Sequence, residues 1–284
     1  NRVSALIGAQ SDDAALAEAR ALPDQAGNAA QRVRALRVLA DQLGQRGPFD
    51  EAITIGQQGM ALAAEAGAQD ELVRLASLTA GNQIKIGRTQ DAYALMLPLR
   101  EWVDREAGDE VRQIWYGYWA AVLGHTGRLR EGVASYDVSI GCAERLGARA
   151  NQCMALLNQC VVLRTMGALP LAIERSRRAL QLLPDASDLA SDSANHRLAR
   201  LMHARNEAET GLLGPAQQAL DTLLPQFEAM GAPFWVQAVR QTQARLWQHL
   251  GQHARAQQAL QAGVVGLQLE VAQWLGVPMQ AAQA

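Results

Sequence analysis

The residues whose spacing could support metal chemistry are His249 and His253. Two histidines four residues apart share one face of a helix, which is the arrangement of a helical zinc site. Gly251 lies between them where a turn is expected, so this shared face does not form. We interpret His196 and His203, which are seven residues apart without carboxylates in ligand spacing, as structural. The sequence therefore predicts no metal site and no cofactor.

Motifs of the common catalytic classes are also missing. The sequence contains no GxSxG nucleophile elbow, no Walker loop and no HExxH motif. The acidic pairs Asp12–Asp13 and Asp109–Glu110 stand where helices are expected to begin, and carboxylates there stabilise the helix dipole. We therefore expect a protein that is not an enzyme.

The cysteines do not form a recognisable redox or metal motif. Cys142, Cys153 and Cys160 are odd in number, and no CxxC occurs. On one helix, Cys153 and Cys160 would be separated by about 10 Å along the axis, at roughly 1.5 Å per residue, which is too far for a disulfide. We expect small buried apolar side chains in a reducing compartment.

Composition excludes several other classes of function. The chain has 284 residues and a formal net charge of −2, whereas nucleic-acid binding usually requires a strongly basic domain. No apolar run is long enough to span a membrane, and the N-terminus has no signal-peptide pattern. We expect a cytoplasmic segment of a larger protein that contacts neither nucleic acid nor membrane.

Glycines recur along the chain at a nearly constant interval. They are separated by 40, 40, 40, 44 and 40 residues, and they are Gly47, Gly87, Gly127, Gly167, Gly211 and Gly251. A small residue follows each of them five positions later: Ala52, Ala92, Gly132, Ala172, Ala216 and Ala256. A fixed period of this size indicates a repeat array. The small residues indicate that two backbones approach closely once in every repeat.

Each repeat is predicted to be a pair of helices. In residues 148 to 184, apolar residues recur at helical spacing before and after Gly167, and Pro170 occupies the first turn of the second helix. A glycine at the break suits a left-handed helix end, and Pro184 is expected to end the second helix. The sequence thus predicts an all-α fold of six helical hairpins, with an additional helix near residues 11–22.

Three segments are expected to depart from this pattern. The longer step of 44 residues contains "PDASDLASDSANH", whose composition predicts a surface loop. Pro98 and Pro225 lie inside predicted second helices, and each should kink its helix or shift a boundary.

These spacings resemble the tetratricopeptide repeat family. The fourth repeat matches the family pattern at Cys160, Gly167, Leu169, Ala172, Ala179 and Pro184. The resemblance covers roughly residues 31 to 275, and repeats of about 40 residues are similar to those of bacterial maltose-regulator-type and peptide-sensing regulators. It implies a right-handed superhelical solenoid with a concave groove lined by the first helices. It divides the chain into an N-terminal helical cap or partial repeat at 1–30 and an array of about six repeats at 31–284.

The aromatic segment "IWYGYWAA", residues 114 to 121, combines core and groove positions. The expected inward stripe is Tyr116, Trp119, Ala120 and Leu123. Tyr118 falls instead on the groove side, where an amphipathic ring suits an interface. Gly117 and Gly124 are expected to leave room for a ligand beside it.

Projecting the repeat phase onto the first helices gives a set of candidate groove residues. They are Arg34, Arg37, Asp41, Arg74, Lys85, Tyr118, Asn158, Arg164, Arg205 and Arg245. One interpretation is a basic wall that accepts a carboxylate-bearing peptide, with Arg34, Arg37, Arg74 and Lys85 converging on one anion. The alternative is that Arg37 and Asp41 form an exposed i,i+4 pair of only ~0.3–0.5 kcal/mol.

The sequence therefore favours a non-catalytic sensor or scaffold module of a bacterial signalling or transcriptional regulator. Its expected partner is a peptide or protein in the concave groove, or a small effector. Two alternatives remain: the regulatory half of a larger signalling enzyme, such as a nucleotide cyclase or an ATPase, and a scaffold that associates into homo-oligomers.

Overall fold

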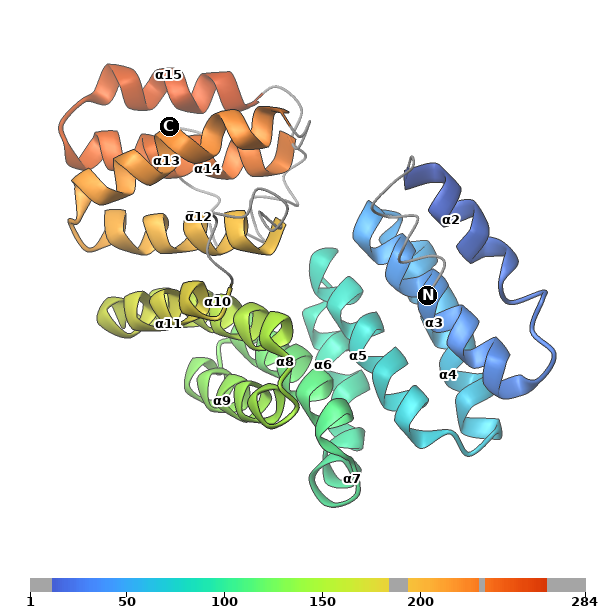
Figure 1. The fold of residues 1–284 in the computed structure, drawn as a ribbon. Coiled ribbons are helices and arrows are strands. Elements are labelled where there is room, and N and C mark those ends of the chain that lie inside the picture. The colour runs from blue at the N-terminus through green and yellow to red at the C-terminus, as the bar shows by residue number, and fades with distance from the viewer. Residues whose placement is uncertain (1–11, 184–193, 230–232, 265–284) are drawn as a thin grey trace. The chain divides into compact units, whose positions relative to one another are not determined.

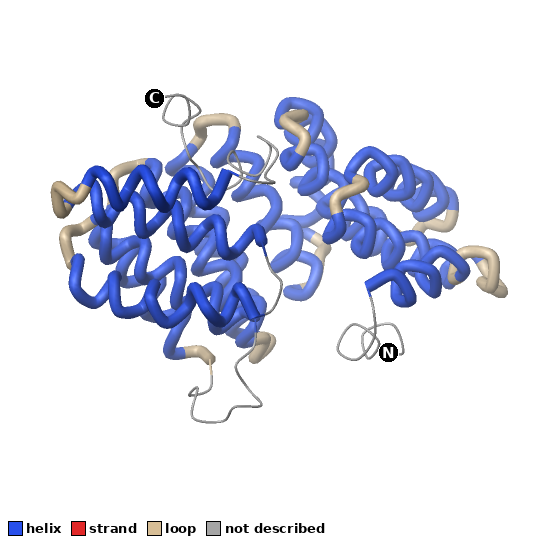
Figure 2. The backbone as a smooth tube through the Cα atoms, turned by 90° about the horizontal axis from the view of Figure 1, so that it is seen from above, coloured by secondary structure: helices blue, strands red, loops and turns tan. Residues whose placement is uncertain are grey.

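The computed structural model describes residues 12–183, 194–229 and 233–264. Within these ranges every regular element is a helix, and Figure 2 shows helices joined by short loops without a strand. The predicted all-α class is confirmed. The chain divides into two compact units, an N-terminal unit (Asn1–Cys142) and a C-terminal unit (Ala143–Ala284).

The N-terminal unit begins with the single helix α2 (Asp12–Ala21), which packs on α3. Three pairs follow, and the first is α3 (Ala29–Arg46) with α4 (Phe49–Glu65). In the second pair α5 (Gln69–Lys85) is followed by a divided second helix, which consists of α6 (Thr89–Met96), η1 (Leu97–Leu99) and α7 (Arg100–Arg105). The third pair is α8 (Asp109–His125) with α9 (Leu129–Arg145), and the last residues of α9 belong to the C-terminal unit. The expected helix near residues 11–22 is therefore present as α2.

The C-terminal unit contains three further pairs, which are α10 (Arg149–Thr165) with α11 (Leu169–Gln181), α12 (Ala194–Glu209) with α13 (Leu213–Ala229), and α14 (Pro233–His249) with α15 (His253–Val264). Figure 1 shows α12 to α15 stacked side by side. In each unit the first helices of successive pairs contact one another, as α3–α5–α8 and as α10–α12–α14. These inner helices carry the predicted groove residues.

The turn glycines have the backbone conformation that the repeat predicts. All six have positive φ, from 71° at Gly251 to 107° at Gly47, a region that glycine adopts without steric cost. At Gly167 the N–H of Ala168 donates to the carbonyl of Leu163 at 2.9 Å, which closes the end of α10. The glycines therefore end the first helix of each pair.

The small residues lie where the two helices of each pair meet. Ala52, Ala92, Ala172 and Ala216 are completely buried, and Ala256 is 2% exposed. At Gly132 an added Cβ would lie 3.1 Å from the carbonyl oxygen of Ala120, tighter than an ordinary contact. This closer approach explains why the third repeat has glycine in place of alanine.

The two interior prolines have different effects. Pro98 lies in η1, where the second helix is divided into α6 and α7, as predicted. At Pro225, α13 continues without interruption, so no boundary is shifted. Pro184 and residues 184–193 of the expected surface loop lie outside the described residues.

The aromatic stripe on α8 differs by one position from the prediction. Trp115 and Trp119 are the buried pair, with stacked rings 5.2 Å apart. Ala120 and Leu123 are buried as expected. Tyr116 is half-buried because its hydroxyl donates to the carboxylate of Asp104 on α7, which keeps the ring at the edge of the core.

Candidate functional site

All ten predicted groove residues lie on inner helices, six in the N-terminal unit and four in the C-terminal unit. They are Arg34, Arg37 and Asp41 on α3, Arg74 and Lys85 on α5, Tyr118 on α8, Asn158 and Arg164 on α10, Arg205 on α12, and Arg245 on α14. Within each unit, the structure brings some of them together and pairs others with carboxylates that the sequence analysis did not identify.

The arginines of the N-terminal unit face carboxylates of the next inner helix. Arg37 Nε donates to Glu71 at 2.8 Å, and Arg34 Nε lies 4.0 Å from the same carboxylate. Arg74 donates to Glu110 of α8 at 3.1 Å. The hydrogen bond of Arg37 thus goes to Glu71 of α5, although the alternative interpretation paired it with Asp41 one turn along α3, whose carboxylate the charge of Arg37 still influences.

Asp41, Lys85 and Tyr118 form a half-buried group in the N-terminal unit. Lys85 Nζ donates to the carbonyl oxygen of Gly44 at 2.7 Å and lies over the ring of Phe49. Burial raises the pKa of Asp41, opposed by a hydrogen bond from Gln45 and by the charges of Arg37 and then Lys85. Burial lowers the pKa of Lys85, opposed by the charge of Asp41. Each of the two groups therefore faces a group of opposite sign, and Arg37 adds a second positive side chain beside Asp41.

Tyr118 lies against the backbone of α5. An added Cβ at Gly81 would come within 2.4 Å of the Tyr118 ring, so the glycine is what allows this contact. Burial, and to a smaller extent the charge of Asp41, raises the pKa of the Tyr118 hydroxyl. The phenol is protonated at neutral pH, as an ordinary tyrosine is, and can donate a hydrogen bond.

The glycines beside Tyr118 do not leave room for a ligand, which corrects the sequence analysis. A Cβ at Gly117 would lie 3.4 Å from the hydroxyl of Ser139 on α9. The backbone nitrogen of Gly124 lies 3.4 Å from the position of a Cβ at Gly132, also on α9. Both glycines therefore face α9, which occupies the space beside them.

Three arginines of the C-terminal unit converge on one carboxylate, Glu209 of α12. Arg164 Nε lies 3.6 Å from Glu209, Arg205 Nε lies 3.4 Å away, and Arg245 Nη1 donates to it at 3.1 Å. These side chains come from α10, α12 and α14, three consecutive inner helices. We call Arg164, Arg205, Arg245 and Glu209 the arginine cluster.

The arginine cluster is largely shielded from solvent. The side chains of Arg164 and Arg205 are 6% and 9% exposed, whereas that of Arg245 is 31% exposed. Burial and the charges of the other two arginines lower the pKa of Arg205 to about 9, which still leaves it charged at neutral pH. Arg245 is therefore the member through which the cluster meets solvent.

Glu209 was missed by the sequence analysis, although a signal for it exists. It stands two residues before Gly211, and Lys85 stands two residues before Gly87. The same phase that selected Lys85 therefore also selects Glu209.

The remaining predicted groove residue of the C-terminal unit, Asn158, is exposed on α10.

A hydrogen-bond network beneath the arginine cluster holds α12 against α11. The amide of Asn206 donates to the carbonyl of Ala172 at 3.1 Å and to the hydroxyl of Ser176 at 3.0 Å. Ser176 Oγ lies 2.8 Å from Nδ1 of His203, whose Nε2 lies 3.4 Å from Glu207. His203 thus has a structural role, as expected, but it does have a carboxylate neighbour at i+4.

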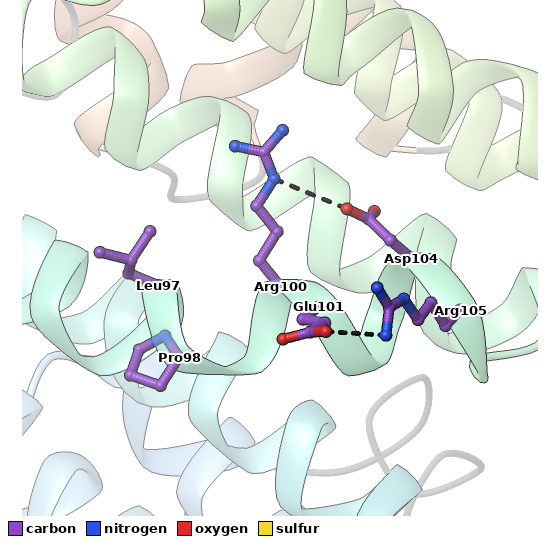
Figure 3. A pocket seen from close by; sticks show the side chains of 6 residues that line it. All are labelled: Leu97, Pro98, Arg100, Glu101, Asp104 and Arg105. Carbon is purple, nitrogen blue, oxygen red and sulfur yellow. Dashed lines mark ion pairs between the residues drawn. The ribbon is translucent and has the colours of Figure 1, made fainter.

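A surface hollow in the N-terminal unit lies along one stretch of chain. Figure 3 shows its lining side chains, Leu97, Pro98, Arg100, Glu101, Asp104 and Arg105. Arg100 pairs with Asp104 at 3.6 Å, and Arg105 pairs with Glu101 at 2.8 Å. The charges of the hollow neutralise each other within one helix.

Groups that could support metal or thiol chemistry are not assembled in the part of the chain that the structure describes. No cluster of three or more histidine, cysteine or acidic side chains suits a metal ion there. His249 ends α14 and His253 begins α15, with Gly251 between them, as predicted. The three cysteines are buried and form no disulfide, and burial raises the pKa of Cys160 to about 12, so its thiolate is not formed at neutral pH.

Across residues 12–183, 194–229 and 233–264, no helix combines the length and the apolar character that crossing a bilayer requires.

No protein-family model matches the sequence, and no curated protein matches it. Solved structures do resemble the fold. Aspartyl phosphate phosphatase F from Bacillus subtilis is 11% identical with a TM-score of 0.69, covering 98% of this chain and 69% of that one. A Rap protein complexed with Competence and Sporulation Factor is 11% identical with a TM-score of 0.63, covering 89% and 68%.

A third similar structure is a signal transduction ATPase with numerous domains from Pyrococcus horikoshii, which has a tetratricopeptide repeat sensor. It is 13% identical with a TM-score of 0.64, and the match covers 89% of this chain but only 42% of the ATPase. These similarities confirm a tetratricopeptide-like helical repeat fold with long repeats.

Proposed function

We propose that this chain is a non-catalytic, peptide- or protein-binding module of a bacterial cytoplasmic signalling or transcriptional regulator. The observation that carries the proposal is the placement of buried charge on the inner helices. Lys85 with Asp41 in one unit and the arginine cluster in the other retain charge away from solvent, which costs free energy unless it is used or neutralised.

The similar structures support a binding role of this kind. One of them is a Rap protein solved in complex with Competence and Sporulation Factor, and another has a tetratricopeptide sensor. In such an array, the inner helices of consecutive repeats supply side chains to one ligand. We assign the residues of 31–284 to the binding array and α2, with the rest of 1–30, to a cap.

The test is selection of binding peptides from a random phage-displayed library, followed by calorimetric titration of a selected synthetic peptide. We expect a 1:1 complex that is weakened by Lys85→Met or by Arg245→Gln. Arg178→Gln on the outer helix α11, where Arg178 pairs with Glu144, is the matched control and should leave affinity unchanged. Failure to select any peptide, or equal loss in the control, would contradict the proposal.

A second function, the regulatory half of a larger signalling enzyme, is favoured by the ATPase with a repeat sensor. The sequence of the complete gene tests it. A nucleotide-binding or cyclase domain adjoining this segment would support it, and a DNA-binding domain would favour the transcriptional regulator.

A further inference from the structure

Exposed aliphatic side chains gather at the hairpin turns of the C-terminal unit. They are 37% to 47% exposed, every turn of the unit contributes at least one, and they are Met166, Leu171, Leu212 and Leu250. Among the described residues, the other large apolar side chains of comparable exposure are Leu97 and Leu146, which lie away from these turns. We call Met166, Leu171, Leu212 and Leu250 the apolar edge.

The three turns lie side by side at one end of the inner helices. Arg164, three residues before Gly167, lies 3.6 Å from Glu209, which stands two residues before Gly211. Glu209 in turn accepts a hydrogen bond from Arg245 of α14 at 3.1 Å. Figure 1 shows the α12–α13 and α14–α15 turns at the same end of the stacked helices. The apolar edge is therefore a row that three consecutive repeats build together.

The turns of the two units differ in charge. From one residue before each turn glycine to three residues after it, the C-terminal unit has the sequences MGALP, TGLLG and LGQHA, whose only ionisable side chain is that of His253. The equivalent sequences of the N-terminal unit are RGPFD, IGRTQ and TGRLR, and each contains an arginine. Charged side chains keep a surface in water, so only the turns of the C-terminal unit suit an apolar contact.

We propose that the apolar edge is the contact through which two copies of this chain form a two-fold symmetric dimer. Single exposed apolar side chains are ordinary, whereas a contiguous apolar patch marks an interaction surface. The dimer goes beyond the proposed function, because peptide binding uses the inner faces of the helices and the apolar edge lies at their turns.

Two properties of the apolar edge select a second copy as its occupant. In a two-fold symmetric interface each patch meets its own copy, so a charged residue near the axis faces a like charge. The turns of the C-terminal unit bring no such pair together, whereas those of the N-terminal unit would oppose arginines. The spacing also matches, because inner helices in contact lie about 8–10 Å apart and a second copy repeats this spacing. Side chains of one copy can therefore lie between those of the other.

Sedimentation velocity of the full chain over a range of concentrations tests the proposal. We expect a reversible equilibrium between monomer and dimer. The double variant Leu212→Glu with Leu250→Glu should raise the dissociation constant of the dimer at least about a hundredfold, because it opposes like charges across the interface. The matched control is Leu97→Glu with Leu146→Glu, which changes two similarly exposed side chains outside the apolar edge and should leave the constant unchanged.

A second measurement locates the contact without adding charge. Leu212 belongs to the middle repeat of the apolar edge, so it lies nearest to the two-fold axis of the dimer. A short bismaleimide should therefore cross-link two copies of Leu212→Cys and not two copies of Leu97→Cys, since the native cysteines are buried. All these substitutions are at exposed side chains, so thermal melts of the variants at concentrations where the chain is monomeric should stay close to that of the unmodified chain.

The possible outcomes separate the dimer from other occupants of the apolar edge. A chain that is monomeric at every concentration overturns the proposal and leaves the apolar edge to a further domain or to a different protein. A dimer that the edge variant does not weaken, or that the control weakens equally, overturns it as well. Cross-linking of Leu97→Cys in place of Leu212→Cys would place the contact elsewhere. No peptide is present in these measurements, so their result is independent of the proposed peptide binding.

Discussion

The inner helices of the two units place opposite charges at equivalent positions of the repeat. Asp41 stands six residues before Gly47, and Arg205 and Arg245 stand six residues before Gly211 and Gly251. Lys85 stands two residues before its turn glycine, as does Glu209. The N-terminal unit thus has an acid where the C-terminal unit has arginines, and a base where the C-terminal unit has an acid.

This inversion has unequal consequences. In the N-terminal unit the charges of Asp41 and Lys85 balance, and burial is what shifts the pKa of each. In the C-terminal unit two repeats supply an arginine at the same phase and a third adds Arg164, so positive charge accumulates around Glu209. The repeat therefore determines where a side chain projects, and the residue type at that position determines whether the site is balanced or charged.

The largest expected effect comes from the small residues that both units share. Ala52→Arg and Ala172→Arg should each destabilise the fold by more than about 3 kcal/mol, because each forces bulk and charge between packed helices. Hydrogen exchange should show loss of protection centred on α3–α5 for Ala52→Arg and on α10–α12 for Ala172→Arg, since repeats depend on their neighbours. Leu171→Arg, at a side chain 47% exposed, is the control. Unchanged thermal melts of the alanine variants would show that the repeat phase is wrong.

The charge balance of the N-terminal unit can be broken at Lys85. Lys85→Met should destabilise the chain by about 2 kcal/mol, because it leaves the half-buried carboxylate of Asp41 with only Arg37 and the amide of Gln45 as partners. The double variant Asp41→Asn with Lys85→Met should recover most of this loss. Chemical denaturation of the two single variants and the double variant measures the coupling, and strictly additive losses would contradict a balanced pair.

The two units can also be compared through the pH dependence of their stability, to which His203 and His125 contribute. Burial, and then the charge of Arg177, lowers the pKa of His203 from its ordinary 6.5, and burial lowers that of His125 in the N-terminal unit. The unfolded chain therefore binds a proton near pH 6.5 that the folded chain does not, so stability is greatest above this pH and falls as pH decreases. Melting temperatures between pH 5 and 8 should show a weaker decline for His203→Gln and for His125→Gln. A slope identical to that of the unmodified chain would contradict burial of the neutral imidazole.

The smallest effect is expected at the exposed arginines of the N-terminal unit. Arg34 is 69% exposed and lies 4.0 Å from Glu71, so Arg34→Gln should change stability by less than about 0.5 kcal/mol. Arg37→Gln, which removes a 2.8 Å bond to the same carboxylate, should cost about 1 kcal/mol. Denaturation curves that rank the two variants in the opposite order would show that Glu71 pairs mainly with Arg34.

Much of the fold could be predicted from particular residues. The glycines with positive φ and the buried alanines five positions later were identified from spacing alone. Both are local requirements, because a left-handed helix end and a close helix contact each demand one residue type at one position. Where a local rule had two outcomes, as with Pro98 and Pro225, the sequence did not distinguish a divided helix from a continuous one.

The sequence by itself determined which residues lie on the inner helices, since the repeat phase assigns each residue to a face. Only the tertiary structure decided their partners. Arg37 bonds a carboxylate 34 residues away in place of the acid one turn along its own helix, and three arginines from separate repeats meet at Glu209. These pairings depend on how far one helix is displaced along the next and on which side chains fit between them. Both follow from the packing of whole helices, so the pairing of charges within each unit is a property of the folded chain.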